Sequence, residues 1–402
     1  MRPFSKRNIA LAALCLCGAG ASVAQTASAD KVQLWGIVDV GIRHTNNEGA
    51  NRDGLTKMLG GGMSQSRWGI KVEEDLGGGT KALVELENRF NADDGSVSTP
   101  FFQLANVGLQ GPLGRLTAGR QWNVLFDVVT STYASFPYSP YMEAYKPELG
   151  MAVGARTSNA LKYTFATPDR SFVGSLQYSF SENNDTSALE AGLPGSAAQV
   201  PAFVASTLGG GAWKTTGGYL RYAVGGAAVG GGFLRTELPG GTDIDAWTVG
   251  GSYRTGPWYF NTGYGQNKAK FAAATSPLVG FRNQVDRAIL GQFWAGQTNG
   301  GFQPGDANKR ELIKFGVGYQ MTTQLNLGVH YFRGKQSGST TGVSNGNTNF
   351  LVAVADYAFS KRTDAYVGVD HTKISGGSAL VLDAASGARN RTGFTAGIRH
   401  RF

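Results

Sequence analysis

The chain has 402 residues and a formal net charge of +9, and only 16% of its residues are charged. Glycine supplies 59 residues, about twice its ordinary share, and aromatic residues supply 11%. A flexible glycine-rich linker protein would lack these recurring aromatics, so the composition excludes that class.

The N-terminus has the pattern of a secretory signal peptide. Three basic residues stand in the first seven positions, and an apolar run over 9–17 follows them. Small residues come next, so we expect cleavage after Ala24, with Ala29 as the alternative. The run is too short to remain as a membrane-spanning helix. We therefore divide the chain into a signal peptide, residues 1–24, and a mature segment, residues 25–402.

Removal of the signal peptide changes the net charge of the protein and removes its cysteines. It takes away three positive charges and leaves a net charge of +6. Both cysteines, Cys15 and Cys17, lie inside it, so the mature segment has no disulfide and no cysteine nucleophile or metal ligand. No other apolar run reaches about 18 residues. The exported protein is thus periplasmic, extracellular or a barrel of the outer membrane.

Short segments of alternating polarity run through the mature sequence. In one of them, Trp68, Ile70 and Val72 alternate with Arg67 and Lys71. A change at every second residue is the period of a β-strand and not of a helix. Each segment therefore has one apolar face and one face that carries charges.

About sixteen such segments can be counted, each near the 9–11 residues with which a tilted strand crosses a membrane. Their expected bounds are 31–44, 64–75, 80–90, 103–111, 114–121, 156–166, 171–180, 216–225, 227–236, 245–255, 257–268, 310–320, 324–335, 348–359, 363–374 and 391–402.

Short and long connections alternate between these segments. Short ones lie at 75–79, 111–114, 255–257 and 360–362, and long ones at 45–63, 91–102, 122–155, 181–215, 269–309, 336–347 and 375–390. Bacterial barrels sort their connections in this way, with short periplasmic turns and long outer loops. The pattern predicts an all-β protein, a 16-stranded antiparallel transmembrane β-barrel with both termini on the periplasmic side.

The two faces of the predicted strands must then meet different surroundings. The apolar face meets lipid, and the charged face meets a wet interior, because an unpaired charge in hydrocarbon costs several kcal/mol. Aromatic residues near the segment ends suit the girdles at the membrane interfaces. They are Trp35, Trp68, Tyr163, Phe165, Tyr178, Phe180, Trp247, Trp258, Tyr331, Phe332, Tyr357 and Phe359. The alternative, the core aromatics of a soluble β-sandwich, leaves the sorting of the loops unexplained.

Several stretches of the sequence match the motifs of one known family, and they are specific to that family only when taken together. They are residues 32–39, 66–71, 74–79, 119–121, 156–163, 356–364 and 397–402. Together they resemble the Gram-negative general porins, in particular the betaproteobacterial branch. The resemblance implies an outer-membrane channel for passive diffusion of small hydrophilic solutes and ions, not an enzyme and without a cofactor. It also implies a homotrimer, and a third long loop that folds inward and narrows the channel.

The loop 122–155 is the candidate for that inward fold, because it combines aromatic anchors with charges. The resemblance places basic side chains on the wall that faces it, and Lys71 and Lys162 share the inward parity of Arg67 and Arg156. Opposed charges would screen solutes by size and charge. The expected constriction residues are Arg67, Lys71, Arg120, Arg156, Lys162, Asp127, Glu143 and Glu148. The alternative for the loop is an outer loop without a pore role.

The sequence departs from the family at Gln103, where the fourth strand would often carry a further arginine. This departure weakens the basic side of the expected constriction. The net charge of +6 still favours anions, so we expect a mild selectivity that leans towards anions.

The C-terminal segment alternates up to a terminal aromatic residue, Phe402. In the family this pattern is the address that the barrel-assembly machinery of the outer membrane reads. The other expected partners are further copies of the chain, outer-membrane lipid and lipopolysaccharide.

Other classes of function fit the sequence less well. The four histidines are scattered without metal-ligand spacing, and the G-x-S-x-G match at 342–346 lies in a polar loop, so neither a metal site nor a hydrolase is favoured. The positive charges are dispersed, which argues against nucleic acid as a partner. A plugged barrel that acts as an adhesin or structural protein, or an outer-membrane hydrolase, remains as an alternative to the channel.

Overall fold

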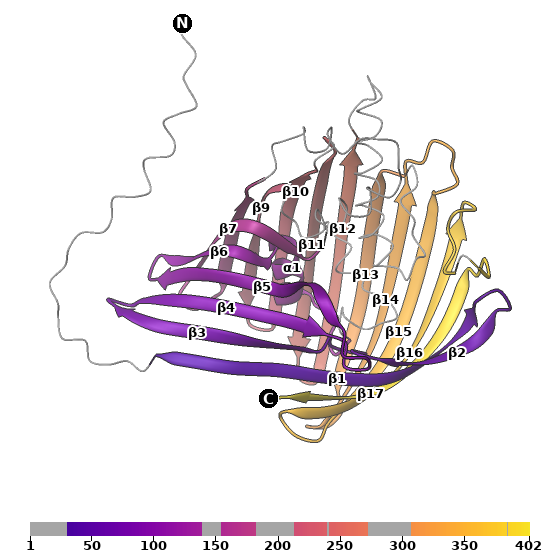
Figure 1. The fold of residues 1–402 in the computed structure, drawn as a ribbon, viewed down its shortest axis with the longest axis horizontal. Helices are drawn as coiled ribbons and strands as arrows, with labels where there is room; N and C mark the ends of the chain where they lie inside the picture. Colours follow the sequence, from indigo (N-terminus) through magenta and orange to yellow (C-terminus); the bar gives the residue numbers. More distant parts are fainter. Residues whose placement is uncertain (1–29, 139–153, 182–212, 239–240, 272–306, 384) are drawn as a thin grey trace, which may run out of the picture.

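A computed structural model of the chain describes residues 30–138, 154–181, 213–238, 241–271, 307–383 and 385–402 (Figure 1). The predicted signal peptide and both predicted cleavage sites lie outside these residues. So do Glu143 and Glu148.

The described residues form seventeen β-strands and one helix, α1 (Val124–Thr132). The strands are β1 (Lys31–Glu48), β2 (Asp53–Leu59), β3 (Arg67–Gly77), β4 (Thr80–Phe90), β5 (Val97–Gly111), β6 (Gly114–Trp122), β7 (Arg156–Ala166), β8 (Phe172–Ser179), β9 (Lys214–Val224), β10 (Ala227–Glu237), β11 (Asp243–Thr255), β12 (Trp258–Lys270), β13 (Lys309–Gln320), β14 (Leu325–Ser337), β15 (Gly346–Ala358), β16 (Thr363–Gly376) and β17 (Asn390–Arg401). In the described part of the chain, no helix is both long enough and apolar enough to span a membrane.

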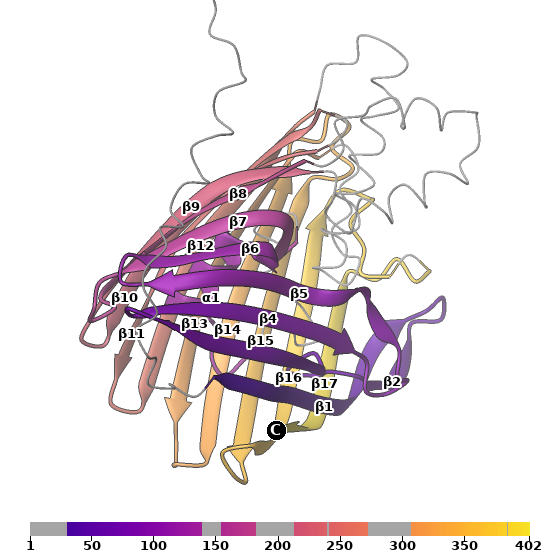
Figure 2. The same ribbon diagram turned by 60° about the vertical axis from the view of Figure 1, so that its left-hand side comes forward.

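Sixteen of the strands close into one antiparallel barrel, which Figures 1 and 2 show from two sides. The first strand, β1, pairs with β17 over 37–45 and with β3 over 31–37, and each later strand pairs with the next. Closure gives each of these sixteen strands a partner on both edges, which a barrel in hydrocarbon requires. The prediction of a 16-stranded antiparallel barrel is therefore confirmed.

The seventeenth strand, β2, lies within the segment 45–63 that was expected to be a loop. It pairs with the outer part of β1, so the first long connection begins as a hairpin that extends beyond the barrel wall (Figure 2). The other sixteen strands agree with the predicted segments to within about three residues at most ends. The main exception is β5, which starts at Val97, six residues before the predicted start.

The two faces of the wall have the predicted polarity. On β1, Val32 and Leu34 are 71% and 62% exposed on the outside, whereas Asp39 and Arg43 on the inside are almost fully buried. An apolar exterior around a polar interior is the reverse of a soluble protein and suits lipid. Tight turns such as those at Gly225 and Gly256, both with positive φ, join strands at the end where the chain termini lie.

Two of the predicted girdle aromatics point into the barrel instead. Trp35 lies opposite Gly69, and Lys71 Nζ sits 5.2 Å from its ring centre. Phe332 is fully buried against Phe350. Both residues fall on the inward parity of their strands, and parity decides the side of the wall more strongly than residue type.

Residues 123–138 run along the inner wall, so the predicted inward fold is confirmed for this part of the loop 122–155. The side chain of Asn123 caps α1 by accepting a hydrogen bond from the backbone N–H of Phe126 at 2.9 Å. The apolar face of α1 then packs on β8 to β11. This cluster consists of Val124, Leu125, Val128, Val173, Tyr219, Leu234 and Ala246.

The chain after α1 continues across β11 to β15. Tyr133 donates to or accepts from Thr248 Oγ1 at 2.5 Å, and Tyr259 donates to the carbonyl of Ala134 at 2.7 Å. Gly250 leaves room for this path, because a Cβ atom there would lie 2.6 Å from the Tyr133 ring. The described part of this segment reaches Tyr138, which lies in a cluster inside the barrel with Met63, Leu312, Phe332, Phe350, Val352, Val354 and Tyr366.

A second segment, residues 62–66, is also held on the inner wall. The carboxylate of Asp39 accepts backbone hydrogen bonds from Gly62, Met63 and Ser64 at 3.2, 3.1 and 2.6 Å. Tyr366 donates a further bond to the same carboxylate at 2.6 Å. The barrel interior is thus partly filled from two directions.

Candidate pore constriction

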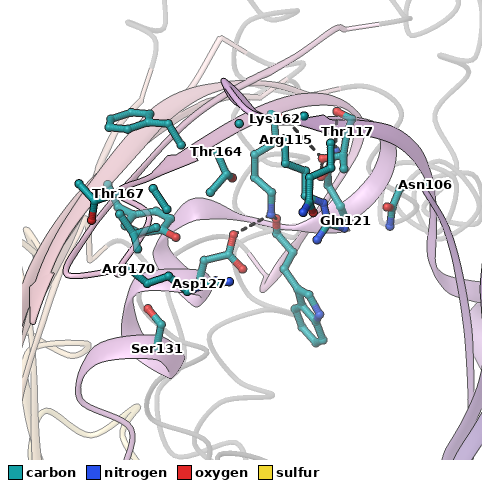
Figure 3. A pocket seen from close by; sticks show the side chains of 18 of the residues that line it. Asn106, Arg115, Thr117, Gln121, Asp127, Ser131, Lys162, Thr164, Thr167 and Arg170 are labelled. Carbon is teal, nitrogen blue, oxygen red and sulfur yellow. Dashed lines mark hydrogen bonds and ion pairs between the residues drawn. The ribbon is translucent and has the colours of Figure 1, made fainter. Parts of the chain in front are cut away.

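The inward segment and the wall of β4 to β8 enclose a cavity of about 580 Å³ (Figure 3). It extends to the short turns around Pro112 and Pro168, so it lies on the periplasmic side of α1. Its lining is polar and mixed in charge. The charged members are Glu85, Arg115, Asp127, Lys162 and Arg170, and hydroxyl and amide groups include Asn106, Thr117, Gln121, Thr130, Ser131, Thr164 and Thr167.

Lys162 and Asp127, which the sequence placed on opposite sides of the constriction, point toward each other in Figure 3. Lys162 Nζ lies 2.6 Å from Asp127 Oδ2 and donates to the carbonyl of Trp122 at 2.9 Å. The pair therefore joins the start of α1 to β7. Burial raises the pKa of the Asp127 carboxyl above its ordinary value, and the charge of Lys162 opposes that rise.

Arg156, the first residue of β7, contacts the same Trp122 whose carbonyl accepts from Lys162. Its guanidinium sits 4.1 Å from the ring centre of Trp122, and that ring stacks with Phe126 of α1 at 4.0 Å. Cation–π contact and stacking hold a positive charge in place at the point where α1 meets the wall.

Arg89 and Glu87 of β4 complete this group. Arg89 Nε donates to Glu87 Oε1 at 2.6 Å, and Arg156 Nη2 lies 3.9 Å from the same oxygen. Arg67 of β3 stands directly across from Arg89 in the register. Three arginines and one glutamate are thus gathered on one part of the inner wall.

The sequence prediction placed Arg67 and Arg156 correctly on the inward face and missed Arg89. Alternation in the sequence could have identified Arg89 as an inward residue, because Arg89 continues the inward parity of Glu85 and Glu87. Lys71 is also on the inward face, where it forms an ion pair with Glu85 at 3.3 Å.

Arg120 is placed differently from the other expected residues. It lies across from Ala105, on the parity of the exposed Val107, whereas the neighbouring Gln121 lines the cavity. Its Nη1 atom donates to Ser158 Oγ at 2.7 Å. Regular alternation along β6 produces this placement, because Arg115, Thr117 and Gln121 line the cavity and the exposed Leu116 shares the parity of Arg120. We therefore leave Arg120 out of the inner lining.

A second cavity, of about 390 Å³, lies between the end of α1 and the wall of β9 to β12. Arg221 Nε donates to the carbonyl of Ser131 at 3.1 Å, and the guanidinium of Arg254 sits 4.5 Å from the ring centre of Tyr259. The sequence prediction also missed these two arginines. Both arginines fall on the inward parity of their strands, so alternation in the sequence could have identified them as inward residues.

A closed barrel with an apolar outside, a charged inside and a segment folded across its interior defines a class: the membrane-spanning barrels with a hydrated interior. Among the described residues, no group of three or more His, Cys, Asp or Glu side chains could hold a metal ion.

The comparisons with known proteins agree with this class. A family model described as Gram-negative porin matches residues 10–377. The chain is 32% identical over 201 residues to an outer membrane porin protein of Bordetella pertussis, covering 44% of this chain and 49% of that protein. It is 31% identical over 261 residues to outer membrane porin protein 32 of Delftia acidovorans, covering 62% and 66%. The aligned segments therefore span about half and just under two thirds of these relatives.

Solved structures share the fold. An anion-selective porin from Comamonas acidovorans superimposes with a TM-score of 0.65 at 22% identity, covering 93% of this chain and all of that one. A trimer form of OmpT, an outer membrane protein of Vibrio cholerae, gives 0.62 at 14% identity, with 93% of this chain and all of that one covered.

The chain belongs to the Gram-negative porin family, whose members are channels of the outer membrane rather than enzymes. The resemblance stated from the sequence is confirmed.

Proposed function

We propose that the chain forms a water-filled channel in the outer membrane for passive diffusion of small hydrophilic solutes and ions, with a weak preference for anions. The observation that carries the preference is the charge of the two cavities along the inward segment. Their linings hold five basic residues, Arg115, Lys162, Arg170, Arg221 and Arg254, against the acidic Glu85 and Asp127. Lys162 is already neutralised by Asp127, so an excess of arginine faces the solute.

The constriction that we propose consists of Arg67, Arg89 and Arg156 on the wall and of the polar side of α1 opposite them. Lys71 contributes at its periplasmic side, while the Lys162–Asp127 pair positions α1 rather than facing the solute as two separate charges. Glu143 and Glu148 stay as predictions for the part of the loop outside the described residues. The similarity to an anion-selective porin from Comamonas acidovorans supports the sign of the preference.

Single-channel recording in a planar bilayer tests this proposal. We expect ohmic conductance steps, and in a salt gradient a reversal potential displaced towards that of the anion. A folded barrel without conductance would instead support the plugged adhesin or structural protein. Hydrolysis of added lipid or peptide would support the hydrolase.

We further propose that the protein is a homotrimer, as the trimer form of Vibrio cholerae OmpT suggests. The mature chain would be residues 25–402, after cleavage at Ala24 or Ala29. Native mass spectrometry of the detergent-solubilised protein tests both points, because it yields the number of subunits and the mass of each. A monomer, or a subunit that retains residues 1–24, would contradict them.

The last residue, Phe402, is proposed to be the contact for the barrel-assembly machinery. It forms two backbone hydrogen bonds with Gly36, each 3.1 Å long, and its ring lies where a side chain at Gly36 would stand. The ring is nonetheless about half exposed on the outside. Deletion of Phe402 should lower the yield of assembled protein in the outer membrane, measured by surface labelling, more than Phe402→Tyr does.

A further inference from the structure

The last strand, β17, closes the barrel between β1 and β16, and we call its contact with β1 the seam. Two glycines, Gly393 and Gly397, stand four residues apart on the inward parity of β17. At these two positions β17 carries no side chain on its inner surface. Side chains of the strands on either side of β17 are therefore able to meet above its backbone.

The first contact across β17 is an ion pair. Arg43 of β1 reaches over Gly393 to Asp370 of β16, and its Nη1 and Nη2 atoms lie 2.7 and 3.0 Å from the two carboxylate oxygens. The Nη1 atom also donates to Thr395 Oγ1 of β17 itself at 2.8 Å. A Cβ atom at Gly393 would lie 2.2 Å from Arg43 Nη2, so the path of the arginine depends on this glycine.

The second contact across β17 is a hydrogen bond. The hydroxyl of Tyr366 on β16 lies over Gly397 and donates to Asp39 Oδ1 of β1 at 2.6 Å. A Cβ atom at Gly397 would lie 2.3 Å from that hydroxyl oxygen. Asp39 also accepts the backbone hydrogen bonds of the segment 62–66, so its carboxylate is fixed on the inner wall.

We call these two contacts, Arg43–Asp370 and Tyr366–Asp39, the seam bridges. All four residues are at most 3% exposed. Loss of one partner would leave the other polar group buried without its contact, which costs more than the loss of a pair on the surface. Each bridge joins β1 to β16 and leaves the backbone of β17 beneath it.

Ion pairs on the opposite side of the barrel are arranged differently. Arg235 of β10 stands directly opposite Asp245 of β11, and Lys214 of β9 stands directly opposite Glu237 of β10. Such pairs strengthen the contact between two neighbouring strands. The seam bridges instead connect the two strands on either side of a third, so they restrain the strand that lies between them.

The long-loop end of the seam is held by further contacts. Arg391 of β17 forms an ion pair with Glu48 of β1 at 2.9 Å. Asp383, in the connection that follows β16, accepts a hydrogen bond from the backbone N–H of Gly49 at 3.1 Å. The first hairpin and the last long connection are thus attached to each other next to the outer end of β17.

The seam also differs from the other strand contacts in its covalent structure. Each other pair of neighbouring strands in the barrel is joined by a turn or a longer connection, whereas β1 and β17 are the two ends of the barrel sheet. Strands joined by a connection stay near each other after their pairing breaks, but β17 can separate from β1 completely. Separation at the seam therefore opens the barrel.

We propose that the seam bridges are a lock on the closing strand. They form above β17 once it lies between its two neighbours, and β17 leaves this place only after both bridges have opened. Release of β17 is the step that limits unfolding of the barrel, and the seam bridges set its rate. The proposal does not depend on which solutes the channel conducts.

The test compares two double variants that carry the same chemical changes. D370N/Y366F removes one charge and one hydroxyl from the seam bridges. The control D245N/Y264F removes them from two contacts between neighbouring strands on the opposite side, each 2.6 Å long. Unfolding of the purified protein in detergent and urea is followed by tryptophan fluorescence. We expect D370N/Y366F to unfold roughly tenfold faster than the wild type, and the control to change the rate by less than about threefold.

A crosslink shows whether the faster unfolding comes from release of β17. Ile42 of β1 and Ala396 of β17 stand directly opposite each other, and the chain has no cysteine after Cys17. In an I42C/A396C background, a short bis-maleimide joins the two strands. The crosslinked protein should unfold at the same rate with and without D370N/Y366F. Without the reagent, the roughly tenfold difference should return.

Hydrogen exchange of the folded protein gives the same comparison without a crosslink. The amides of β17 should exchange faster in D370N/Y366F than in the wild type, and those of β10 to β12 should not. The single variants D370N and Y366F should show smaller changes of the same kind, and they provide every readout if the double variant assembles poorly. Equal unfolding rates for the two double variants, an acceleration that persists in the crosslinked protein, or unchanged exchange of β17 would each overturn the proposal.

Discussion

The Nζ atom of Lys162 lies 2.6 Å from Oδ2 of Asp127, and this contact joins β7 to the first turn of the inward helix. Both side chains are mostly buried, so removal of one leaves the other with an uncompensated charge. Lys162→Met should therefore weaken the attachment of α1 by about 1–3 kcal/mol. Hydrogen exchange of the α1 amides measures this change. The double variant K162M/D127N should recover part of the loss, and additive effects would show that the two residues do not act through each other.

The raised pKa of Asp127 gives the channel a dependence on pH. As the pH falls through that pKa, the carboxylate gains a proton and loses its negative charge while Lys162 keeps its positive one. The cavity then becomes more basic, so the preference for anions should increase. Because this pKa is raised, the increase should begin at a higher pH than it would for an ordinary aspartate. Reversal potentials recorded between pH 7 and pH 3 check this, and D127N should abolish the change.

Arg156 holds a fixed positive charge against Trp122 at the proposed constriction. Arg156→Gln should lower the ratio of anion to cation permeability by roughly a factor of two, because a local positive potential is lost. The reversal potential in a salt gradient gives the ratio directly. Arg362→Gln, in a short turn away from the constriction, serves as the control and should leave the ratio unchanged.

Gly250 is needed because the ring of Tyr133 packs against its backbone. Gly250→Val should push this ring away and loosen the inward segment, which would raise the conductance or its noise. The same substitution in a Tyr133→Ala background should have a smaller effect, since the clash is then removed. Equal noise in both backgrounds would show that the glycine acts in another way.

Asp39 accepts four hydrogen bonds from the segment 62–66 and from Tyr366. Asp39→Ala leaves these donors without their acceptor inside the barrel and should lower the free energy of unfolding by about 2–4 kcal/mol. Urea titration of the protein refolded into vesicles measures the loss. Asp169→Ala, in the exposed turn between β7 and β8, should change it much less.

The barrel follows from the sequence because alternation, loop sorting and strand length each depend on local residue patterns. The inner lining follows only in part. Arg67 lies on the inward face by the regular alternation of β3, whereas alternation along β6 places Arg120 on the outward face, against the expectation from the resemblance. Arg156 contacts Trp122 from β7, where a register shift interrupts the alternation. The contact between Lys162 and Asp127 depends on how a loop folds back across eight strands. That path is determined by space at positions such as Gly250, where the sequence shows only a small residue.

The pairing of Phe402 with Gly36 sets the order of events in biogenesis. The first and last strands of the barrel, β1 and β17, are neighbours, so the cylinder cannot close before β17 pairs with β1. A product cut short by a single strand would expose the backbone of both β1 and β16 to its surroundings. A chain that lacks β17 should therefore be degraded rather than form a smaller pore.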